Sequence, residues 1–366
     1  MKLDYKNKLS VDEIFNKKKA HFSNQVSKKN NYLICGDNLS SLLKLLESDI
    51  RFDLCYIDPP FSTGNVFKTS STRTATISSS MQDNIAYTDN LKGEDFIEFI
   101  RQRAIVIREL LTDEGSFYLH IDYKIGHYVK VILDEVFGAS NFRNDITRIK
   151  CNPKNFDRNA FGNVKDLILF YTKSKKPIWN PTSLKLSQKD IESLFKKVDE
   201  KGRRYTTVPI HAPGETKSGA TSQIWKGMYP PKGRHWRCSP KELDELDEKN
   251  LIEWSKTGNP RRIIYADEHK GKKIQDIWEF KDPMYPKYPT QKNLDLLKFI
   301  ISTSSNKDSY VLDAFCGSGT TLVAAQDEGR NWVGIDESSE AIKTVESRLK
   351  DYSFMNQKPF IKIKAK

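Results

Sequence analysis

Short apolar runs and amphipathic segments alternate along the first half of the chain. The apolar runs are rich in β-branched and aromatic residues, which is typical of buried strands. They span residues 32–35, 52–57, 115–121 and 167–171. The amphipathic segments have apolar side chains at helical spacing and span residues 39–46, 96–111 and 129–137, with Asn38 as the expected N-cap of the first. This alternation predicts an α/β fold, with a parallel sheet and helices on both of its faces.

The same alternation returns near residue 310 in a more specific form. A strand ending at Asp313 is followed by a Gly/Ser/Thr-rich turn at 316–321 and a helix at 322–326. A second strand, 331–335, ends in Asp336. The glycines allow close approach of the backbone to a ligand, and the second acid suits a ribose diol. Because Leu322 stands where a dinucleotide fingerprint has its third glycine, the pattern fits either a dinucleotide or an adenosyl compound.

Two stretches interrupt this alternation. Residues 62–90 are rich in Ser and Thr with little periodicity, which is typical of a disordered segment or an active-site loop. Residues 201–237 contain eight Lys and Arg residues but one acid, Glu215, among many Gly, Pro and Trp residues. This composition predicts a loop-rich, positively charged surface with interleaved aromatic residues, within an inserted module at 179–285. The alternative is a solvated basic lobe that binds nothing.

Composition restricts the class of protein further. The net charge of +12 over 366 residues favours a polyanionic partner such as nucleic acid, although a lysine-rich organism would produce the same excess. The five cysteines are scattered and never form a C-x-x-C pair, which indicates neither a disulfide framework nor a zinc site. The sequence has neither an apolar run of about 20 residues nor a secretory signal. We therefore expect a cytoplasmic protein without a membrane partner or a metal.

The apolar run 52–57 ends abruptly in Asp58-Pro59-Pro60-Phe61. The two prolines make the turn rigid and leave backbone carbonyls outside any helix. A carboxylate, a free carbonyl and an aromatic ring at one strand end can hold a planar group that bears an amine, because the two oxygens accept its N–H bonds while the ring stacks on its face. The alternative is an ordinary strand exit with Phe61 in the core.

These motifs together resemble the DNA amino-methyltransferases. Asp58 to Phe61 is similar to the catalytic [D/N/S]-P-P-[Y/F/W] motif of that family, and Asp313 to Thr321 is similar to its F-x-G-x-G cofactor loop. The catalytic motif comes first, which is the permuted order of the β-class enzymes and of type III modification subunits. Gly36-Asp37 resembles the acidic turn that meets the adenine of the cofactor. Tyr288 to Lys292 resembles the H-P-T-Q-K motif, with tyrosine in place of histidine.

The resemblance implies a Rossmann-like sheet in permuted order that binds S-adenosyl-L-methionine, with an inserted target-recognition domain. The expected parts are a basic N-terminal arm (1–30), a catalytic half (31–178), the target-recognition insert (179–285), a cofactor-binding half (286–352) and a basic C-terminal tail (353–366). The expected catalytic residues are Asp58, Pro59, Pro60 and Phe61. The expected cofactor-binding residues are Asp37, Asp58, Thr290, Lys292, Asp313, Phe315, Cys316, Gly317, Ser318, Gly319, Thr320 and Asp336. In the basic insert, Lys217, Lys226 and Lys232 are candidates for phosphate contacts, and Arg234 and Arg237 for contacts to base edges. Trp236, which lies between the two arginines, is a further expected DNA-binding residue.

The expected activity is methylation of the N6 amino group of a flipped-out adenine in double-stranded DNA, within a restriction–modification system. Asp58 and the Pro59 carbonyl would accept the two amine hydrogens and free the nitrogen lone pair for attack on the sulfonium methyl. An N4-cytosine methyltransferase of the same class is the main alternative. A NAD-dependent oxidoreductase or a non-enzymatic nucleic-acid-binding protein are more remote ones. The resemblance leaves open a homodimer and a cognate restriction endonuclease as further partners.

Overall fold

The computed structural model describes residues 2–28, 30–60, 66–69, 84–88, 93–153, 159–181, 183–184, 186–282, 292–351 and 359–366. The chain divides into two compact units: Met1–Pro181 together with Gln275–Lys366, and Thr182–Ile274. Thr290 and Phe61 lie outside the described residues, as does most of 62–90. Within that last stretch, β3 (Val66–Thr69) pairs antiparallel with β4 (Asn84–Thr88). None of the helices described is long and apolar enough to span a bilayer.

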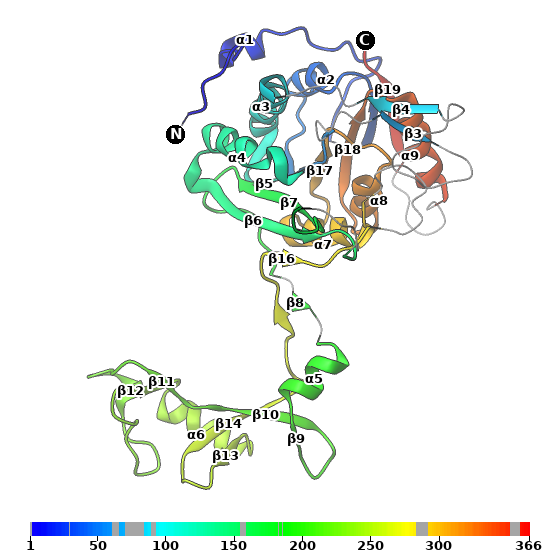
Figure 1. Ribbon diagram of the computed structural model, residues 1–366. Coiled ribbons are helices and arrows are strands. Elements are labelled where there is room, and N and C mark those ends of the chain that lie inside the picture. Colours follow the sequence, from blue (N-terminus) through cyan, green and yellow to red (C-terminus); the bar gives the residue numbers. More distant parts are fainter. Residues whose placement is uncertain are drawn as a thin grey trace. The chain divides into compact units, whose positions relative to one another are not determined.

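A nine-stranded sheet forms the centre of the larger unit, in the order β16-β6-β7-β5-β2-β17-β18-β1-β19 (Figure 1). Its strands are β1 (Asn31–Cys35), β2 (Phe52–Ile57), β5 (Leu111–Ile121), β6 (Phe142–Ile149), β7 (Lys165–Thr172), β16 (Ile277–Trp278), β17 (Tyr310–Asp313), β18 (Asn331–Asp336) and β19 (Phe360–Lys364). The prediction of a wholly parallel sheet was wrong for β7, which is antiparallel to both β5 and β6. The other strand pairs are parallel.

Helices cover both faces of this sheet, as the sequence predicted. They are α1 (Val11–Phe15), α2 (Asn38–Leu45), α3 (Gly93–Leu110), α4 (Tyr123–Phe137), η1 (Ala139–Asn141), α7 (Leu294–Ser304), α8 (Thr320–Asp327) and α9 (Ser339–Asp351). The helices α2, α3 and α4 share one apolar core with Cys55 and Ile57 of β2. On the opposite face α8 packs against β18, where a side chain at Gly334 would meet Leu322 at 2.5 Å.

Both ends of the chain belong to the larger unit. The N-terminal residues Ile14, Ala20 and Phe22 are buried in the same core as α2 and α3, although the sequence suggested a basic arm. The basic C-terminal tail expected over 353–366 was wrong where the structure describes it, because 360–364 form β19 beside β1. In β19 the apolar Ile363 is buried while Lys362 and Lys364 are exposed, which is how an edge strand avoids pairing with other chains.

The helix α2 begins one residue earlier than the sequence indicated. Asp37 is its N-cap, since the Asp37 carboxylate accepts a hydrogen bond from the backbone N–H of Ser40 at 2.8 Å. Asn38, the expected cap, instead donates to the Ala314 carbonyl at 2.9 Å and accepts from Arg103 at 2.6 Å. The side chain of Asn38 therefore connects the first half of the chain to the turn after β17.

The smaller unit has more regular structure than its composition suggested. A four-stranded antiparallel sheet runs in the order β13-β14-β10-β9, and two pairs of strands, β11-β12 and β15-β8, accompany it. Ile210, Trp225, Trp236 and Leu243 form its apolar core. The elements are β8 (Ser183–Leu184), α5 (Gln188–Leu194), β9 (Lys197–Val198), β10 (Arg204–Pro209), β11 (His211–Pro213), η2 (Ala220–Ser222), β12 (Arg234–Trp236), α6 (Pro240–Glu248), β13 (Ile252–Trp254), β14 (Pro260–Tyr265) and β15 (Lys272–Lys273).

Candidate active site

The central strands β2 and β17 lie side by side, and the chain leaves them in opposite directions. From β2 it continues to β5 by way of α3 on one face, and from β17 to β18 by way of α8 on the other. This arrangement opens a crevice at the carboxyl ends of the two strands, where α/β proteins bind their ligands. A cavity of about 490 Å³ lies there. It is lined by Asp37, Asn38, Tyr56, Asp58, Pro60, Phe99, Arg103, Lys292, Asp313, Ala314, Phe315, Cys316, Gly317, Ser318, Thr320, Thr321, Asp336, Glu337, Ser338 and Ser339.

The structure thus brings together ten of the residues that the sequence assigned to the cofactor. Two of the remaining assignments need comment. Gly319 does not line the cavity: it is the N-cap of α8 in a left-handed conformation (φ = 76°), and a side chain there would lie 2.8 Å from Val345 of α9. Its lack of a side chain therefore makes room for α9. Thr290 lies outside the described part of the chain, as does Phe61. Pro59, from the catalytic motif, is buried beside Asp58.

The carboxylate of Asp58 is held through one of its two oxygens. Its Oδ2 forms an ion pair with Lys292 at 2.8 Å. Its Oδ1 is buried and has no hydrogen-bond partner among the described residues. The nearest charged or polar group recorded for Oδ1 is the Nδ1 atom of His120, at 3.9 Å. A buried carboxylate oxygen without a donor is costly, so Oδ1 is a candidate acceptor for a donor group of a ligand that enters the cavity.

Asp313 and Asp336 are held by backbone N–H groups of the loop between them and of the turn after β18. The Asp336 carboxylate accepts hydrogen bonds from the N–H of Gly317 at 2.8 Å and from that of Ser338 at 2.9 Å. Asp313 accepts one from the N–H of Phe315 at 3.0 Å. Burial raises the pKa of both carboxyls, and that of Asp313 to about 7. A cationic ligand beside them would stabilise their ionised forms.

An arginine of α9 anchors the same loop, although no sequence motif pointed to it. The Nη1 of Arg348 donates to the carbonyl of Ser318 at 2.6 Å and lies 3.1 Å from the hydroxyl of Thr320. Arg348 occupies the last turn of α9, so it reaches the loop across a distance in sequence that local patterns cannot reveal.

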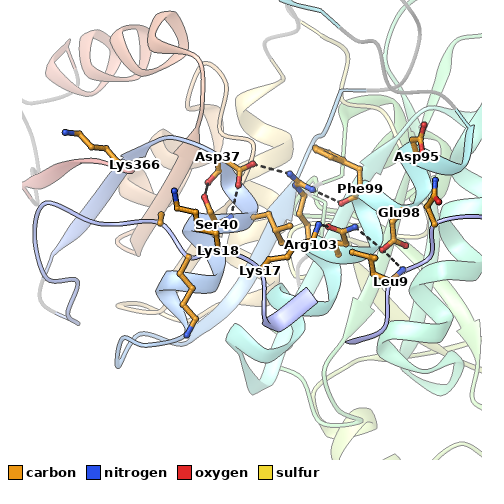
Figure 2. A pocket seen from close by; sticks show the side chains of 15 residues that line it. Leu9, Lys17, Lys18, Asp37, Ser40, Asp95, Glu98, Phe99, Arg103 and Lys366 are labelled. Carbon is orange, nitrogen blue, oxygen red and sulfur yellow. Dashed lines mark hydrogen bonds and ion pairs between the residues drawn. The ribbon is translucent and has the colours of Figure 1, made fainter. Parts of the chain in front are cut away.

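Arg103 is a second residue of the cavity that the sequence analysis missed. Its Nη2 lies 3.5 Å from Asp37, and its guanidinium stacks on the Phe99 ring at 3.4 Å (Figure 2). Burial lowers its pKa to about 10, against the effect of Asp37. Arg103 lies between this cavity and a second hollow of about 740 Å³. The sequence did contain a signal for Arg103. Arg103 follows Phe96 and Ile100 at helical spacing, so a charged side chain lies on the buried face of α3.

The basic residues of the smaller unit differ in how far their charges are already paired. Lys217 and Lys232 are exposed, whereas Lys226 forms an ion pair with Asp247. Trp236 is buried in the core of the unit and donates to the Gln223 carbonyl at 2.9 Å. Arg234 and Arg237 are exposed, and their contacts are with His211 Nδ1 at 3.3 Å and the Pro209 carbonyl at 3.1 Å.

Comparison with known proteins agrees with the arrangement of the cavity. The family model described as DNA methylase, for N6 and N4 methyltransferases, matches residues 52–347. The type II methyltransferase M.EcaI of Enterobacter cloacae is 43% identical over 325 residues, which cover 87% of this chain and 69% of that protein. The type III restriction-modification enzyme StyLTI Mod subunit of Salmonella typhimurium is 27% identical over 330 residues, covering 80% of this chain and 49% of that subunit.

Among solved structures, the M1.HpyAVI–SAM complex is 18% identical with a TM-score of 0.45, covering 87% of this chain and 99% of that chain. The family model spans both β2 with its Asp-Pro-Pro motif and β18 with Asp336. The chain belongs to the N6/N4 family of DNA methylases.

Proposed function

We propose that this chain transfers a methyl group from S-adenosyl-L-methionine to the N6 atom of an adenine that is flipped out of double-stranded DNA. The chain is a DNA methyltransferase of the N6/N4 family, and S-adenosyl-L-methionine is its cofactor. The choice of adenine and the roles of individual residues are the proposed parts.

The observation that carries the proposal is the environment of Asp58. Asp58 lines the cavity, its Oδ1 is buried without a hydrogen-bond donor among the described residues, and its Oδ2 forms an ion pair with Lys292. An exocyclic amine has two N–H bonds to donate, and Oδ1 can accept one of them. We assign the second acceptor to the Pro59 carbonyl. The ion pair with Lys292 orients the Asp58 carboxylate, so the acceptor is in place before the base arrives.

We place the cofactor at the other end of the cavity. Asp336 is fixed by two backbone N–H groups at the end of β18, and we assign it to the ribose hydroxyls. Asp313 and Asp58 lie at the ends of adjacent strands, and we place the charged sulfonium near them. When bound, the cofactor supplies an electrophilic methyl group. The protein brings the amine into line with that methyl and excludes water from the reaction.

The aspartate at the head of the catalytic motif favours adenine, because serine-led motifs are more typical of the N4-cytosine enzymes. Cytosine N4 remains the second candidate, since both amines offer the same pair of N–H donors. In either case the base has to leave the duplex to reach Asp58, and unstacking costs a few kcal/mol. Phe61 is the proposed stacking partner of the flipped base.

We assign DNA binding to the smaller unit. Lys217, Lys232 and Arg234 are exposed there. Among the described residues none of the three forms an ion pair, whereas Lys226 is paired with Asp247. Trp236 is buried in the core of that unit and is better described as support for β12 than as a DNA contact. The similarity to a type II methyltransferase and to a type III Mod subunit supports a place in a restriction–modification system. A cognate endonuclease would then be a partner.

The test is methylation of duplex DNA with S-adenosylmethionine that carries a labelled methyl group, followed by mass spectrometry of the nucleosides. We expect label in N6-methyladenine and none in N4-methylcytosine. Label in N4-methylcytosine would contradict the choice of base. Sequencing of the modified positions would then identify the target sequence. Binding of NAD in preference to S-adenosylmethionine would contradict the assignment of the cavity.

A further inference from the structure

A row of polar side chains is buried behind Asp58. Tyr56, His120, Asp166 and Arg148 are each exposed by 2% or less. Burial of ionisable groups is costly unless they are paired, and an apolar core would be at least as stable at such positions. The row begins at Tyr56, which lines the cavity, and ends near Lys150, whose side chain is partly exposed.

The strand directions explain how the row is formed. Tyr56 and His120 lie near the carboxyl ends of the parallel strands β2 and β5. Because β7 is antiparallel, its first residues lie at this same edge, and Asp166 is the second residue of β7. Arg148 is the register partner of Asp166 on β6. Four neighbouring strands therefore each contribute one polar side chain to a single line.

The hydrogen bonds along the row have a direction. His120 Nε2 lies 3.2 Å from Asp166 Oδ2, and Asp166 is ionised beside Lys150 at 2.6 Å. A carboxylate can only accept, so we assign the imidazole proton to Nε2. His120 Nδ1 then carries the ring lone pair, and it accepts a hydrogen bond from the Tyr56 hydroxyl at 2.8 Å. In this tautomer Nδ1 is an acceptor and does not donate to Asp58 Oδ1.

The charges around His120 keep it neutral. Burial and then Lys292 lower the pKa of His120, against the hydrogen bond and the charges of Asp166 and Asp58. Burial acts to raise the pKa of Asp166, but His120, Lys292 and Lys150 outweigh it, and the pKa of Asp166 is lowered. Burial and Asp58 raise the pKa of Tyr56, so its hydroxyl remains a donor. A neutral imidazole next to an ionised carboxylate is a base that can take up one proton.

We propose that His120, held by Tyr56 and Asp166, receives the proton that the methylated amine releases through Asp58. This inference rests on the proposed function of Asp58. In the reaction the amine nitrogen forms a bond to the methyl carbon, and the carbon–sulfur bond breaks with its electron pair on sulfur. The nitrogen is then cationic and passes one proton to Asp58 Oδ1. Asp58 passes the proton to His120 Nδ1, as the Tyr56 hydroxyl rotates away.

The resulting imidazolium lies between the carboxylates of Asp58 and Asp166, which stabilise it. After the methylated base leaves, the proton returns through Asp58 to water in the open cavity. The separation of 3.9 Å between Asp58 Oδ1 and His120 Nδ1 has to shorten for the transfer. Such contacts commonly tighten only when the substrate is bound. His120 does not touch the base in this scheme, so it is a positioning and proton-receiving residue.

The test compares His120→Asn and Tyr56→Phe with the wild type on a duplex DNA that the wild type methylates. The observable is the single-turnover rate of methyl transfer as a function of pH. The wild-type rate should fall at a pH below 6.5, the ordinary pKa of histidine, as His120 becomes protonated. His120→Asn should lower the plateau by roughly 10²-fold and abolish this acid limb. Tyr56→Phe should move the limb to higher pH, because the neutral imidazole loses its donor.

The charged groups around His120 are Asp58 after β2, Asp166 on β7, Arg148 on β6, Lys150 directly after β6, and Lys292 before α7. The shift caused by Tyr56→Phe distinguishes His120 from them, because the Tyr56 hydroxyl donates to the His120 ring. In His120→Asn the affinities for S-adenosylmethionine and DNA should stay within about twofold, since His120 does not line the cavity. His127→Asn is the matched control, because His127 is an exposed histidine on α4.

Two outcomes overturn the inference. One is a folded His120→Asn variant with the wild-type rate and the wild-type acid limb. The other, which decides if His120→Asn does not fold, is an acid limb that stays at the same pH in Tyr56→Phe. A wild-type protein that binds S-adenosylmethionine but methylates no DNA would instead contradict the proposed function.

Discussion

The two oxygens of the Asp58 carboxylate lie in different environments, and this difference is the basis of the proposed chemistry. Lys292 neutralises one oxygen at 2.8 Å, while the other is buried and has no donor among the described residues. A carboxylate arranged in this way is ready to accept a hydrogen bond without first being desolvated. The aspartate therefore acts as an acceptor prepared in advance, at the expense of stability in the free protein.

The first prediction concerns Asp58→Ala. This variant should lose methyl transfer by at least about 10²-fold, because the amine loses its charged acceptor. Binding of S-adenosylmethionine should remain measurable by calorimetry, since Asp336 and the loop at 317–320 are unchanged. Asp53→Asn, near the other end of β2, is the control and should keep wild-type turnover. Near-normal turnover of Asp58→Ala in a labelled-methyl assay would contradict the mechanism.

A second prediction follows from the pKa of Asp313, which burial raises to about 7 from an ordinary value near 3.8. The folded protein therefore holds this proton more tightly than the unfolded chain does. Stability from this group is complete below about pH 4 and is lost as the pH rises through 7, by about 1.4 kcal/mol for each pH unit within that window. Asp313→Asn should remove this loss. The measurement is the difference in melting temperature between the variant and the wild type from pH 4 to 8, which should increase with pH.

A constant difference in melting temperature would show that Asp313 does not titrate in that range.

At the residue scale, the sequence predicted Asp58, Asp313 and Asp336 because each ends an apolar strand. It did not predict Tyr56 or His120, since a polar side chain inside an apolar run has no recognisable local pattern. The contacts of His120 come from strands that are distant in sequence, and only the folded sheet brings them together.

At the scale of elements, the loop between β17 and α8 contains two glycines that lie in different surroundings. Gly317 (φ = 47°) lines the cavity. Among the described residues, a Cβ atom added there would have one neighbour within 4 Å, the Phe315 carbonyl oxygen at 3.9 Å. Gly319 packs against Val345 of α9. The motif alone treats both as ligand contacts, whereas the structure separates a ligand-facing glycine from one that packs between helices.

The third prediction uses this difference. Gly319→Ala should destabilise the protein by about 1–3 kcal/mol, because its new methyl group overlaps Val345 and the left-handed backbone disfavours a side chain. Gly317→Ala has the same left-handed backbone strain but no overlap with a neighbouring side chain among the described residues, so it should destabilise the protein less and should weaken binding of S-adenosylmethionine. Urea denaturation and titration calorimetry on both variants separate the two effects. Combining Gly319→Ala with Val345→Ala should recover part of the stability, and no recovery would contradict the packing explanation.

The strands and helices of the larger unit were largely predictable because their hydrophobic patterns are long and regular. The direction of β7 was not, since residues 166–172 are buried on both faces and such a run fits either direction. The strand β19 was missed because Lys362 and Lys364 alternate with apolar residues and read as a charged tail. Its place beside β1 depends on a pairing across the whole chain.

At the scale of the whole molecule, the net charge of +12 indicates a polyanionic partner but does not show which lysines contact it. Within the smaller unit, Lys226 is already paired with Asp247, whereas Lys217 and Lys232 are exposed and have no ion pair recorded in the described chain. A lysine that already has an acidic partner contributes less to the release of counterions from DNA.

The fourth prediction therefore separates these lysines. The double variant Lys217→Gln, Lys232→Gln should reduce the slope of log affinity for duplex DNA against log salt by up to ~0.9 for each phosphate that is no longer neutralised. Lys226→Gln is the matched control and should change the slope less. Affinity for S-adenosylmethionine should not change in either variant. An unchanged slope in the double variant would support a basic lobe that is merely solvated.

The pairing of β2 with β17 also has a consequence for the newly made protein. β2 ends at Ile57 and β17 begins at Tyr310, and the segment between them takes on the order of tens of seconds to synthesise at about 5–20 residues per second. During this time β5 can protect one edge of β2, but the other edge has no strand to pair with. A ribosome-bound chain is therefore both inactive and prone to aggregate until its last part emerges. Methylating capacity in a growing cell would consequently lag behind the start of translation, and chaperones would have an exposed apolar strand to recognise.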